Sequence, residues 1–167
     1  MVGKYVFDSS TIILLAKVTI LRSFSKAKET IITETVKQEV FEKKESEDAI
    51  IIRNVLEEQN IREYEGNIDF KRVATDFGIG AGEAEAITLA WKNKDIVATD
   101  DYRAIKACKA LNIKFITAIH CLIFIRQKEL IDIPLALEKL KKLEKLGRYT
   151  PAIIQDAQKI IKGENYG

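Results

Sequence analysis

Aspartates follow two short apolar runs that have the length and composition of buried strands. Asp8 comes after the run Lys4–Phe7, and Asp100 and Asp101 come after the run Asp95–Thr99. In open parallel α/β sheets, ligands bind outside the carboxyl ends of the strands, so these acids are predicted to meet at one edge of a sheet. Carboxylate oxygens are the ligands that Mg²⁺ and Mn²⁺ prefer. Metal-assisted displacement at a phosphodiester is the chemistry that such a cluster suggests.

Two glutamates on predicted helices extend the acidic set. Glu39 lies beside the apolar stripe of a helix predicted over residues 34–43, and Glu83 lies in the first turn of a helix predicted over 81–93. The spacing of Glu83 to Ala86 and Ile87 predicts that it shares their packed face. A charged carboxylate directed at a core is costly unless it meets a cation or lines a cleft. The predicted catalytic and metal-ligating residues are therefore Asp8, Glu39, Glu83 and Asp101.

Several neighbours are predicted to support these acids. Glu85 lies roughly 200° around the helix from Glu83 and is the weaker candidate ligand. Asp100 is a neighbour of Asp101, and Ser10 and Thr99 are candidate hydroxyls that orient carboxylates. The alternative for both hydroxyls is simple burial with a satisfied backbone bond.

Arg103 and Lys106 follow Asp101 on one predicted helix and are candidate phosphate contacts, with a surface ion pair as the alternative. Each acid also has an ordinary explanation. Asp8 and Asp101 can cap the helices that follow them, and Glu83 can favour the positive end of its helix. The functional hypothesis depends on four separate segments each supplying an acid.

Composition limits the classes of protein to which the chain can belong. Its 167 residues suit one domain, and its net charge of +2 neither favours nor excludes nucleic acid. Cys108, Cys121 and His120 are too few for a zinc site and are predicted to lie in or near the core. Free thiols, an N-terminus that resembles a strand, and the absence of a long apolar run predict a cytoplasmic protein with no membrane span.

Short apolar runs alternate with helical patterns along the chain. Further strands are predicted over 30–33, 61–64 and 114–117, with helices between them and helices over 119–128, 134–146 and 151–162. This alternation predicts a three-layer α/β/α sandwich with a central parallel sheet. Residues 1–167 are expected to form one domain, with 134–167 as a C-terminal helical extension packed on it. Within that extension, Lys139–Arg148 is predicted to be a solvated helix face. The leucines among these lysines can pack on the domain or form a partner surface.

Four segments resemble the PIN-domain family. Tyr5-Val6-Phe7-Asp8-Ser9-Ser10 resembles its opening strand, and Val36-Lys37-Gln38-Glu39-Val40 resembles the helix that carries its second acid. Gly82-Glu83-Ala84-Glu85-Ala86-Ile87 is similar to the helix start that gives the third acid. Val97-Ala98-Thr99-Asp100-Asp101 is similar to the strand end that gives the fourth, where the pattern of Thr, any residue and Asp selects Asp101. The tail Leu146-Gly147-Arg148-Tyr149 also resembles a prokaryotic subgroup.

The resemblance implies a Mg²⁺ or Mn²⁺ site and cleavage of RNA by a metal-dependent endoribonuclease. Many relatives are toxins held inactive by an antitoxin, and many form homodimers, so it also implies an antitoxin partner and a homodimer. Two alternatives stay open. A phosphatase of the haloacid dehalogenase type also opens with an aspartate after its first strand, but it needs a second aspartate where this chain has Ser10. A PIN-like module that binds RNA or a partner without catalysis is the other.

Overall fold

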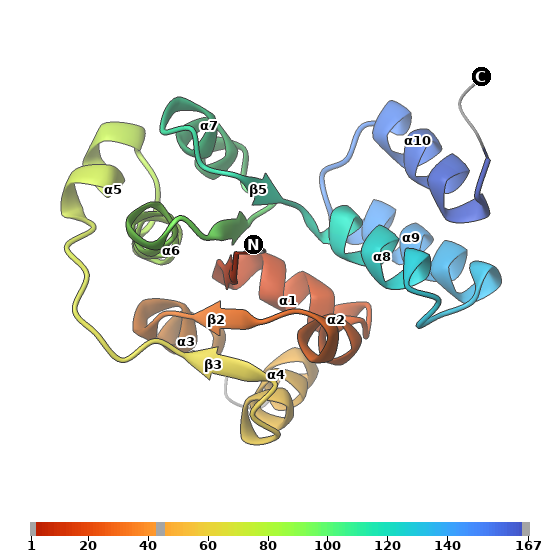
Figure 1. Cartoon of the computed structure of the whole chain (residues 1–167), viewed down its shortest axis with the longest axis horizontal. Helices are drawn as coiled ribbons and strands as arrows, with labels where there is room; N and C mark the ends of the chain where they lie inside the picture. The colour runs from red at the N-terminus through yellow and green to blue at the C-terminus, as the bar shows by residue number, and fades with distance from the viewer. Residues whose placement is uncertain (1–2, 43–45, 165–167) are drawn as a thin grey trace.

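A parallel five-stranded sheet forms the centre of the protein in a computed structural model, which describes residues 3–42 and 46–164 (Figure 1). Its strand order is β3-β2-β1-β4-β5, and each neighbouring pair is parallel. The strands are β1 (Tyr5–Phe7), β2 (Thr30–Ile32), β3 (Ile61–Glu63), β4 (Ile96–Ala98) and β5 (Phe115–Ile116). The predicted sheet is therefore confirmed, with strands one or two residues shorter than expected.

Helices cover both faces of the sheet and make the predicted three-layer sandwich. Because successive residues of a strand face opposite ways, Val6 and Val97 belong to one hydrophobic cluster while Phe7 and Ala98 belong to the other. On the Val6 face lie α5 (Lys71–Phe77), α6 (Ala81–Asn93) and α7 (Tyr102–Ala110). On the Phe7 face lie α1 (Ser9–Lys17), α2 (Leu21–Ala27), α3 (Glu34–Val40), α4 (Glu47–Glu57) and α8 (Ala118–Gln127).

Helix α2 is the element that the sequence pattern did not predict. Thr19 has a positive φ of 60°, so the chain turns sharply between α1 and α2. Leu21 and Phe24 then fill the core on the Phe7 face. The predicted helix over 34–43 is also shorter, because α3 ends at Val40, and its last predicted residue, Lys43, lies outside the described residues.

The last two helices, α9 (Ile133–Leu146) and α10 (Pro151–Lys162), pack on α8 beside the sheet (Figure 1). Leu140 and Leu143 are buried in the same cluster as Phe7. One expectation for this region is wrong. Lys139 is not on a solvated face, because its ammonium group donates to the carbonyl oxygen of Val18 at 2.9 Å in a buried contact. It therefore satisfies an end carbonyl of α1 from a distant part of the chain.

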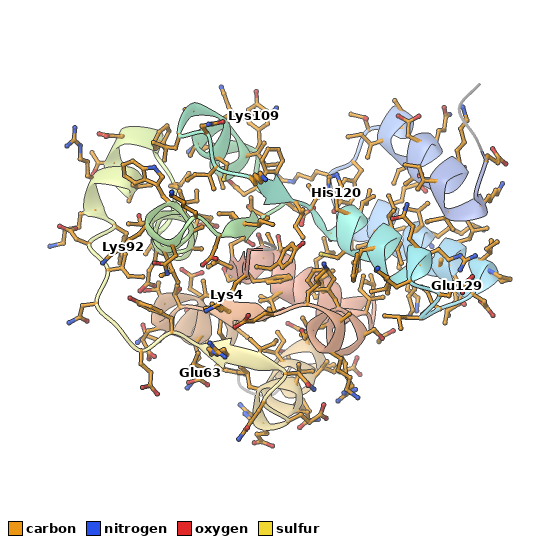
Figure 2. All side chains as sticks on the ribbon, viewed as in Figure 1. Lys4, Glu63, Lys92, Lys109, His120 and Glu129 are labelled. Atoms are coloured by element: carbon orange, nitrogen blue, oxygen red, sulfur yellow. The ribbon has the colours of Figure 1, made fainter. Side chains whose placement is uncertain are left out.

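The expectation for His120 is also wrong, whereas the two cysteines are buried as predicted. His120 is exposed in the first turn of α8 (Figure 2). Its Nδ1 accepts from the backbone N–H of Thr117 at 3.0 Å, so it caps the helix. Apolar neighbours in sequence did not reveal this role, because a residue in the first turn of a helix can point away from the face that its neighbours bury.

Candidate active site

Asp8 is fully buried at the junction of β1 and α1, where its carboxylate is held by three donors. The backbone N–H of Thr11 donates to Oδ1 at 2.8 Å, and the hydroxyl of Ser10 donates to the same oxygen at 3.2 Å. The hydroxyl of Thr99 donates to Oδ2 at 2.5 Å. Asp8 is therefore the cap of α1, as the simpler interpretation expected, and it also lies next to β4, the strand that precedes Asp101.

Glu39 reaches from α3 towards the starts of two other helices. Its Oε1 accepts from the backbone N–H of Gly82 at 3.0 Å, and its Oε2 accepts from the hydroxyl of Ser9 at 2.5 Å. Glycine at position 82 leaves room for this carboxylate, because a Cβ there would lie 2.5 Å from Glu39 Oε2. The contact places the carboxylate of Glu39 between the residue after Asp8 and the residue before Glu83.

Glu83 lies in the first turn of α6 and is half-buried. Its carboxylate folds back over the N-cap, since a Cβ on Gly80 would lie 2.6 Å from Glu83 Oε2. The predicted packed face was assigned to the wrong glutamate. Glu85 is the buried one of the pair, and Glu83 lies at the border between protein and solvent.

Asp101 caps α7, because its Oδ1 accepts from the backbone N–H of Ala104 at 2.8 Å. Thr99 links this residue to Asp8. Its hydroxyl oxygen accepts from the backbone N–H of Asp101 at 3.2 Å while its proton goes to Asp8 Oδ2. The predicted supporting hydroxyl of Thr99 is thus shared by two of the four acids.

The carboxylates influence one another electrostatically. Burial raises the pKa of Asp8 to about 7, against the hydrogen bonds from Thr99 and Thr11, which lower it, and the charge of Glu83 adds to the rise. Burial also raises the pKa of Glu83, as do the charges of Glu39 and Asp101. In the described residues, no ion pair with Lys or Arg compensates any of the four acids.

This donor set fits a hard divalent cation in its chemistry, since it offers oxygen ligands and uncompensated negative charge. The four carboxylates are not arranged as a complete set of metal ligands. Within residues 3–42 and 46–164, no three His, Cys, Asp or Glu side chains lie close enough together to share an ion. Glu39 and Asp101 are instead held by neighbouring backbone N–H groups, so the carboxylates would have to turn inward to ligate.

Comparison with known protein families decides which kind of fold this is. A family model described as a PIN domain matches residues 4–162 of the chain. The chain belongs to the PIN-domain family. The match spans the sheet, the helices on both of its faces and the C-terminal helices, and it gives the chain a nuclease-like fold. No curated protein matches the chain.

Two acids of this PIN domain that were predicted to support the site bond instead to other parts of the protein. Glu85 points from α6 to α3, where its Oε2 accepts from the backbone N–H of Thr35 at 3.0 Å. Among the described residues, Asp100 has three hydrogen-bond partners. It accepts from the hydroxyl of Thr11 at 2.8 Å, from the backbone N–H of Ala118 at 3.2 Å and from the phenol of Tyr149. Asp100 thereby joins α1, α8 and the segment between α9 and α10.

Three contributors to the PIN site were missed by sequence reasoning. Ser9 holds Glu39, Thr11 contacts both Asp8 and Asp100, and Tyr149 reaches Asp100 from the tail, whereas Ser10 orients a carboxylate as predicted. The Ser-Ser-Thr run after a strand was the available signal for the first two, since such residues start helices. Nothing local to Tyr149 indicates that its partner lies 49 residues earlier.

The two predicted phosphate contacts lie on the exposed surface of α7. Arg103 donates to the carbonyl oxygen of Gly78 at 3.2 Å, which ties α7 to the end of α5. The ammonium of Lys106 lies 5.2 Å from the ring centroid of Tyr102, an exposed residue that directly follows Asp101. Of the two cations, Lys106 is the one without a competing carbonyl contact in the described structure.

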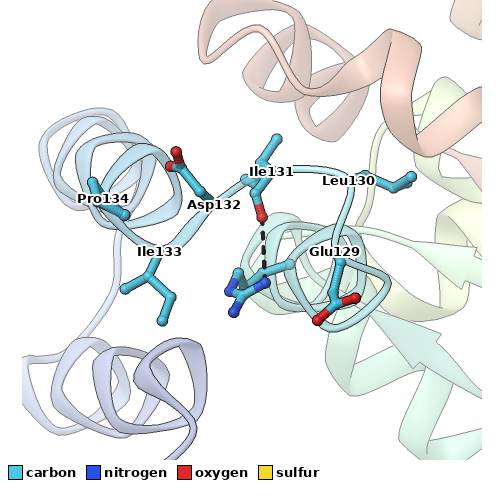
Figure 3. Close-up of a pocket in the computed structure, with 7 residues that line it drawn as sticks. Glu129, Leu130, Ile131, Asp132, Ile133 and Pro134 are labelled. Atoms are coloured by element: carbon cyan, nitrogen blue, oxygen red, sulfur yellow. Dashed lines mark hydrogen bonds between the residues drawn. The ribbon is translucent and has the colours of Figure 1, made fainter.

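Two hollows on the molecule have linings that exclude the four acids. One lies at the turn from α8 to α9, where Arg126 donates to the carbonyl oxygen of Ile131 at 3.4 Å (Figure 3). Asp132 in that turn caps α9 through the N–H of Leu135, so the turn is a structural connection. The other lies between α3, α6 and the segment that leads from β3 to α5, next to the acids.

In the described residues, no helix is long and apolar enough to cross a membrane.

Proposed function

We propose that this PIN-domain protein is a metal-dependent endoribonuclease that hydrolyses RNA phosphodiester bonds. One observation carries the proposal: Asp8, Glu39, Glu83 and Asp101 come from four segments, yet Thr99 contacts both Asp8 and Asp101, and Glu39 contacts Ser9 and Gly82, the chain neighbours of Asp8 and Glu83. Carboxylates that lie near one another without a basic partner are stabilised in their charged forms by a bound cation.

Asp8, Glu39, Glu83 and Asp101 would hold Mg²⁺ or Mn²⁺. When bound, the ion would neutralise charge on the phosphodiester and lower the pKa of a water nucleophile. The protein's own groups fix the acids for this purpose. The hydroxyl of Thr99 and the N–H of Thr11 orient Asp8, and Ser9 orients Glu39. Half-buried Glu83 lies at the border between protein and solvent, where its carboxylate can complete the set of oxygen ligands.

Substrate contacts are proposed on the exposed side of α7. Lys106 carries an ammonium group that can meet a phosphate on the 3′ or 5′ side of the bond to be cleaved, and Arg103 can do so if it leaves Gly78. The protein's net charge of +2 is small, so these local cations matter more than the total.

Cleavage of a labelled RNA in the presence of Mn²⁺ or Mg²⁺ tests the proposal. We expect activity that EDTA abolishes and that Asp8→Asn reduces by roughly 1000-fold, because the variant removes a ligand and a charge. Asp76→Asn is the matched control, since Asp76 lies on the surface of α5 in an ion pair with Arg72, and it should keep wild-type activity. Equal cleavage by the wild type and Asp8→Asn would show contamination and contradict the proposal.

The same assays separate the other interpretations. Release of phosphate from an aryl phosphate without RNA cleavage would favour the phosphatase, although Ser10 stands where that class needs its second aspartate. RNA binding without cleavage at any metal concentration would favour a non-catalytic module. The toxin role, the antitoxin and the homodimer stay predictions from the family resemblance. Growth arrest on expression, relieved by Asp8→Asn, would support the toxin role.

A further inference from the structure

The hollow beside the acids has a volume of about 490 Å³ and a lining suited to a nucleobase. It lies between α3, α6 and the segment that links β3 to α5. The polar and aromatic residues that line it include Glu34, Gln38, Asn67, Asp69, Phe70 and Glu85. The volume falls within the range of small-molecule sites in proteins.

Glu85 is the unusual member of this lining. It is 5% exposed, and only one of its two oxygens has a partner: Oε2 accepts from the N–H of Thr35, whereas Oε1 accepts no hydrogen bond from the described residues. Oε1 is therefore free to accept hydrogen bonds from a ligand that brings N–H groups into the hollow.

The hollow is lined by close chain neighbours of two of the acids. Gln38 lines it and is adjacent to Glu39, and Glu85 lines it from two residues after Glu83. Helices α3 and α6 are fixed to each other by a reciprocal pair of bonds, from the N–H of Gly82 to Glu39 and from the N–H of Thr35 to Glu85. The acids and the hollow thus share two rigidly connected walls.

We propose that this hollow binds an unpaired guanine of the RNA substrate, and this inference rests on the proposed ribonuclease function. Guanine presents two neighbouring donors, N1–H and the N2 amino group, and then the acceptor O6. Glu85 Oε1 and the Glu34 carboxylate are acceptors for the donors, and the Asn67 amide is a donor for O6. Phe70 offers an aromatic face for stacking, as in other sites that bind single-stranded bases.

The other bases match this lining less well. Adenine, cytosine and uracil each present a single donor position beside a ring acceptor or carbonyl, so one of the carboxylates would face a lone pair. A well-made bidentate contact between a base and a side chain discriminates by roughly tenfold or more. The hollow is therefore expected to make cleavage depend on guanine at one fixed position relative to the cut.

Nucleoside titration tests the site apart from catalysis. We would add guanosine, inosine and adenosine to the ¹⁵N-labelled protein and follow the backbone amides of Thr35 and Gly66, which flank the hollow. Guanosine should shift both amides at millimolar concentration. Inosine, which lacks the N2 amino group, and adenosine should bind about fivefold more weakly or worse. Absence of any shift at these amides with guanosine, or equal binding of adenosine, would overturn the proposal.

Glu85→Gln sharpens the test because it keeps the shape of the side chain. Its amide oxygen can still accept from Thr35, while its NH₂ group would meet the guanine N–H donors and repel them. We expect guanosine binding to fall by about tenfold. Glu138→Gln, an exposed change on α9, is the matched control and should bind as the wild type does. If Glu85→Gln does not fold, Asn67→Ala on the exposed rim serves instead. Wild-type binding by a folded Glu85→Gln, or by Asn67→Ala where it replaces Glu85→Gln, would contradict the assignment.

Mapping of cleavage sites separates this proposal from the ribonuclease function. In a random RNA library, the wild type should cut with guanine enriched at one offset, and Glu85→Gln should lose that enrichment while still cutting other sequences. Guanosine binding by a protein that cleaves no RNA would contradict the ribonuclease function and leave the guanine site supported. RNA cleavage without guanosine binding or guanine enrichment would sink only the guanine site.

Discussion

At the scale of one residue, Asp8 is a buried acid whose charge lowers the stability of the folded protein. The carboxylate is fully buried, and three hydrogen bonds offset only part of the cost of its charge, because burial still raises its pKa to about 7. A group whose folded pKa exceeds its unfolded value destabilises the folded protein once it is ionised. A bound cation would reverse this effect, so the strain at Asp8 is consistent with a site built for a ligand.

Asp8→Asn is predicted to stabilise the metal-free protein at neutral and alkaline pH. The folded state holds the Asp8 proton between about 3.8 and about 7, so the wild type loses stability as the pH rises through this window. We expect the free energy of unfolding of the variant to exceed that of the wild type by roughly 1–4 kcal/mol at pH 8 in EDTA. The difference should vanish below pH 4. Urea unfolding at several pH values measures it.

The surface change Asp76→Asn is the control for this experiment, because Asp76 is an exposed member of an i,i+4 ion pair. Its unfolding free energy should stay within about 0.5 kcal/mol of the wild type at both pH extremes. A less stable Asp8→Asn protein at pH 8 would contradict the account of Asp8 as a charge held at a cost.

Gly82→Ala is predicted to lower ribonuclease activity with little change in the free energy of unfolding. The new Cβ would lie 2.5 Å from Glu39 Oε2, so the Glu39 carboxylate must move, while alanine suits the first turn of α6. We expect ribonuclease activity to fall on the order of 100-fold. The free energy of unfolding should change by less than about 1 kcal/mol.

Ala81→Ser is the neighbouring control, since Ala81 is exposed in the same turn. Wild-type cleavage by Gly82→Ala would show that the position of Glu39 is unimportant. Gly82 itself could be located from the sequence only as part of a family pattern. Its reason for being glycine is the approach of a side chain from a helix 43 residues earlier, which no local rule reveals.

At the scale of elements, two of the acids cap a helix just after the end of a strand. Asp8 caps α1 directly after β1, and Asp101 caps α7 two residues after Thr99, which follows β4. The capping interpretation and the functional interpretation are therefore compatible, because one carboxylate oxygen can satisfy a helix start while the other faces a neighbour. Strand ends and cap residues were the strongest signals in the sequence, and these two acids were placed correctly at such positions.

The elements that were predicted poorly depend on distant contacts. Helix α2 is buried through Phe24, whose ring packs edge-on against those of Phe7 and Tyr5. Its seven residues are too few to show a clear period, so tertiary packing rather than local pattern defines it. Lys139 was misassigned for a similar reason, since the carbonyl that it contacts is 121 residues earlier.

Tyr149→Phe is predicted to loosen the connection between the C-terminal helices and the strand ends. The phenol donates to Asp100, which also holds Thr11 and the first turn of α8. Loss of one hydrogen bond to a carboxylate should lower the free energy of unfolding by roughly 1–3 kcal/mol. Amide exchange at Ala118, whose N–H also goes to Asp100, should become faster.

Tyr102→Phe provides the comparison, because Tyr102 is 71% exposed and its hydroxyl has no hydrogen bond to the described residues. It should leave the free energy of unfolding within about 0.5 kcal/mol of the wild type. Equal stability of Tyr149→Phe and Tyr102→Phe would mean that the Asp100 contact contributes nothing to the packing of the tail.

At the scale of the whole molecule, the strand order brings acids that are far apart in the sequence to one edge of the sheet. β1 lies between β2 and β4, so Asp8 at the end of β1 stands between α3, which follows β2, and α7, which follows β4. Helix α6 contacts β1, α3 and α7 and brings Glu83 to the same edge. The order of these strands follows from the parallel α/β class only in outline. The sequence therefore predicted the layers and the sheet edge at which Asp8 and Asp101 lie, whereas a shared metal site of the four acids stays a prediction.

The most direct test is a crystal structure of the protein soaked in Mn²⁺, with anomalous scattering used to locate the ion. We predict an anomalous peak among Asp8, Glu39, Glu83 and Asp101, with carboxylate oxygens at roughly 2.0–2.3 Å and water completing the shell. The peak should be absent from Asp8→Asn soaked in the same way. Full metal occupancy elsewhere on the molecule, or none at this edge at millimolar Mn²⁺, would contradict the central claim.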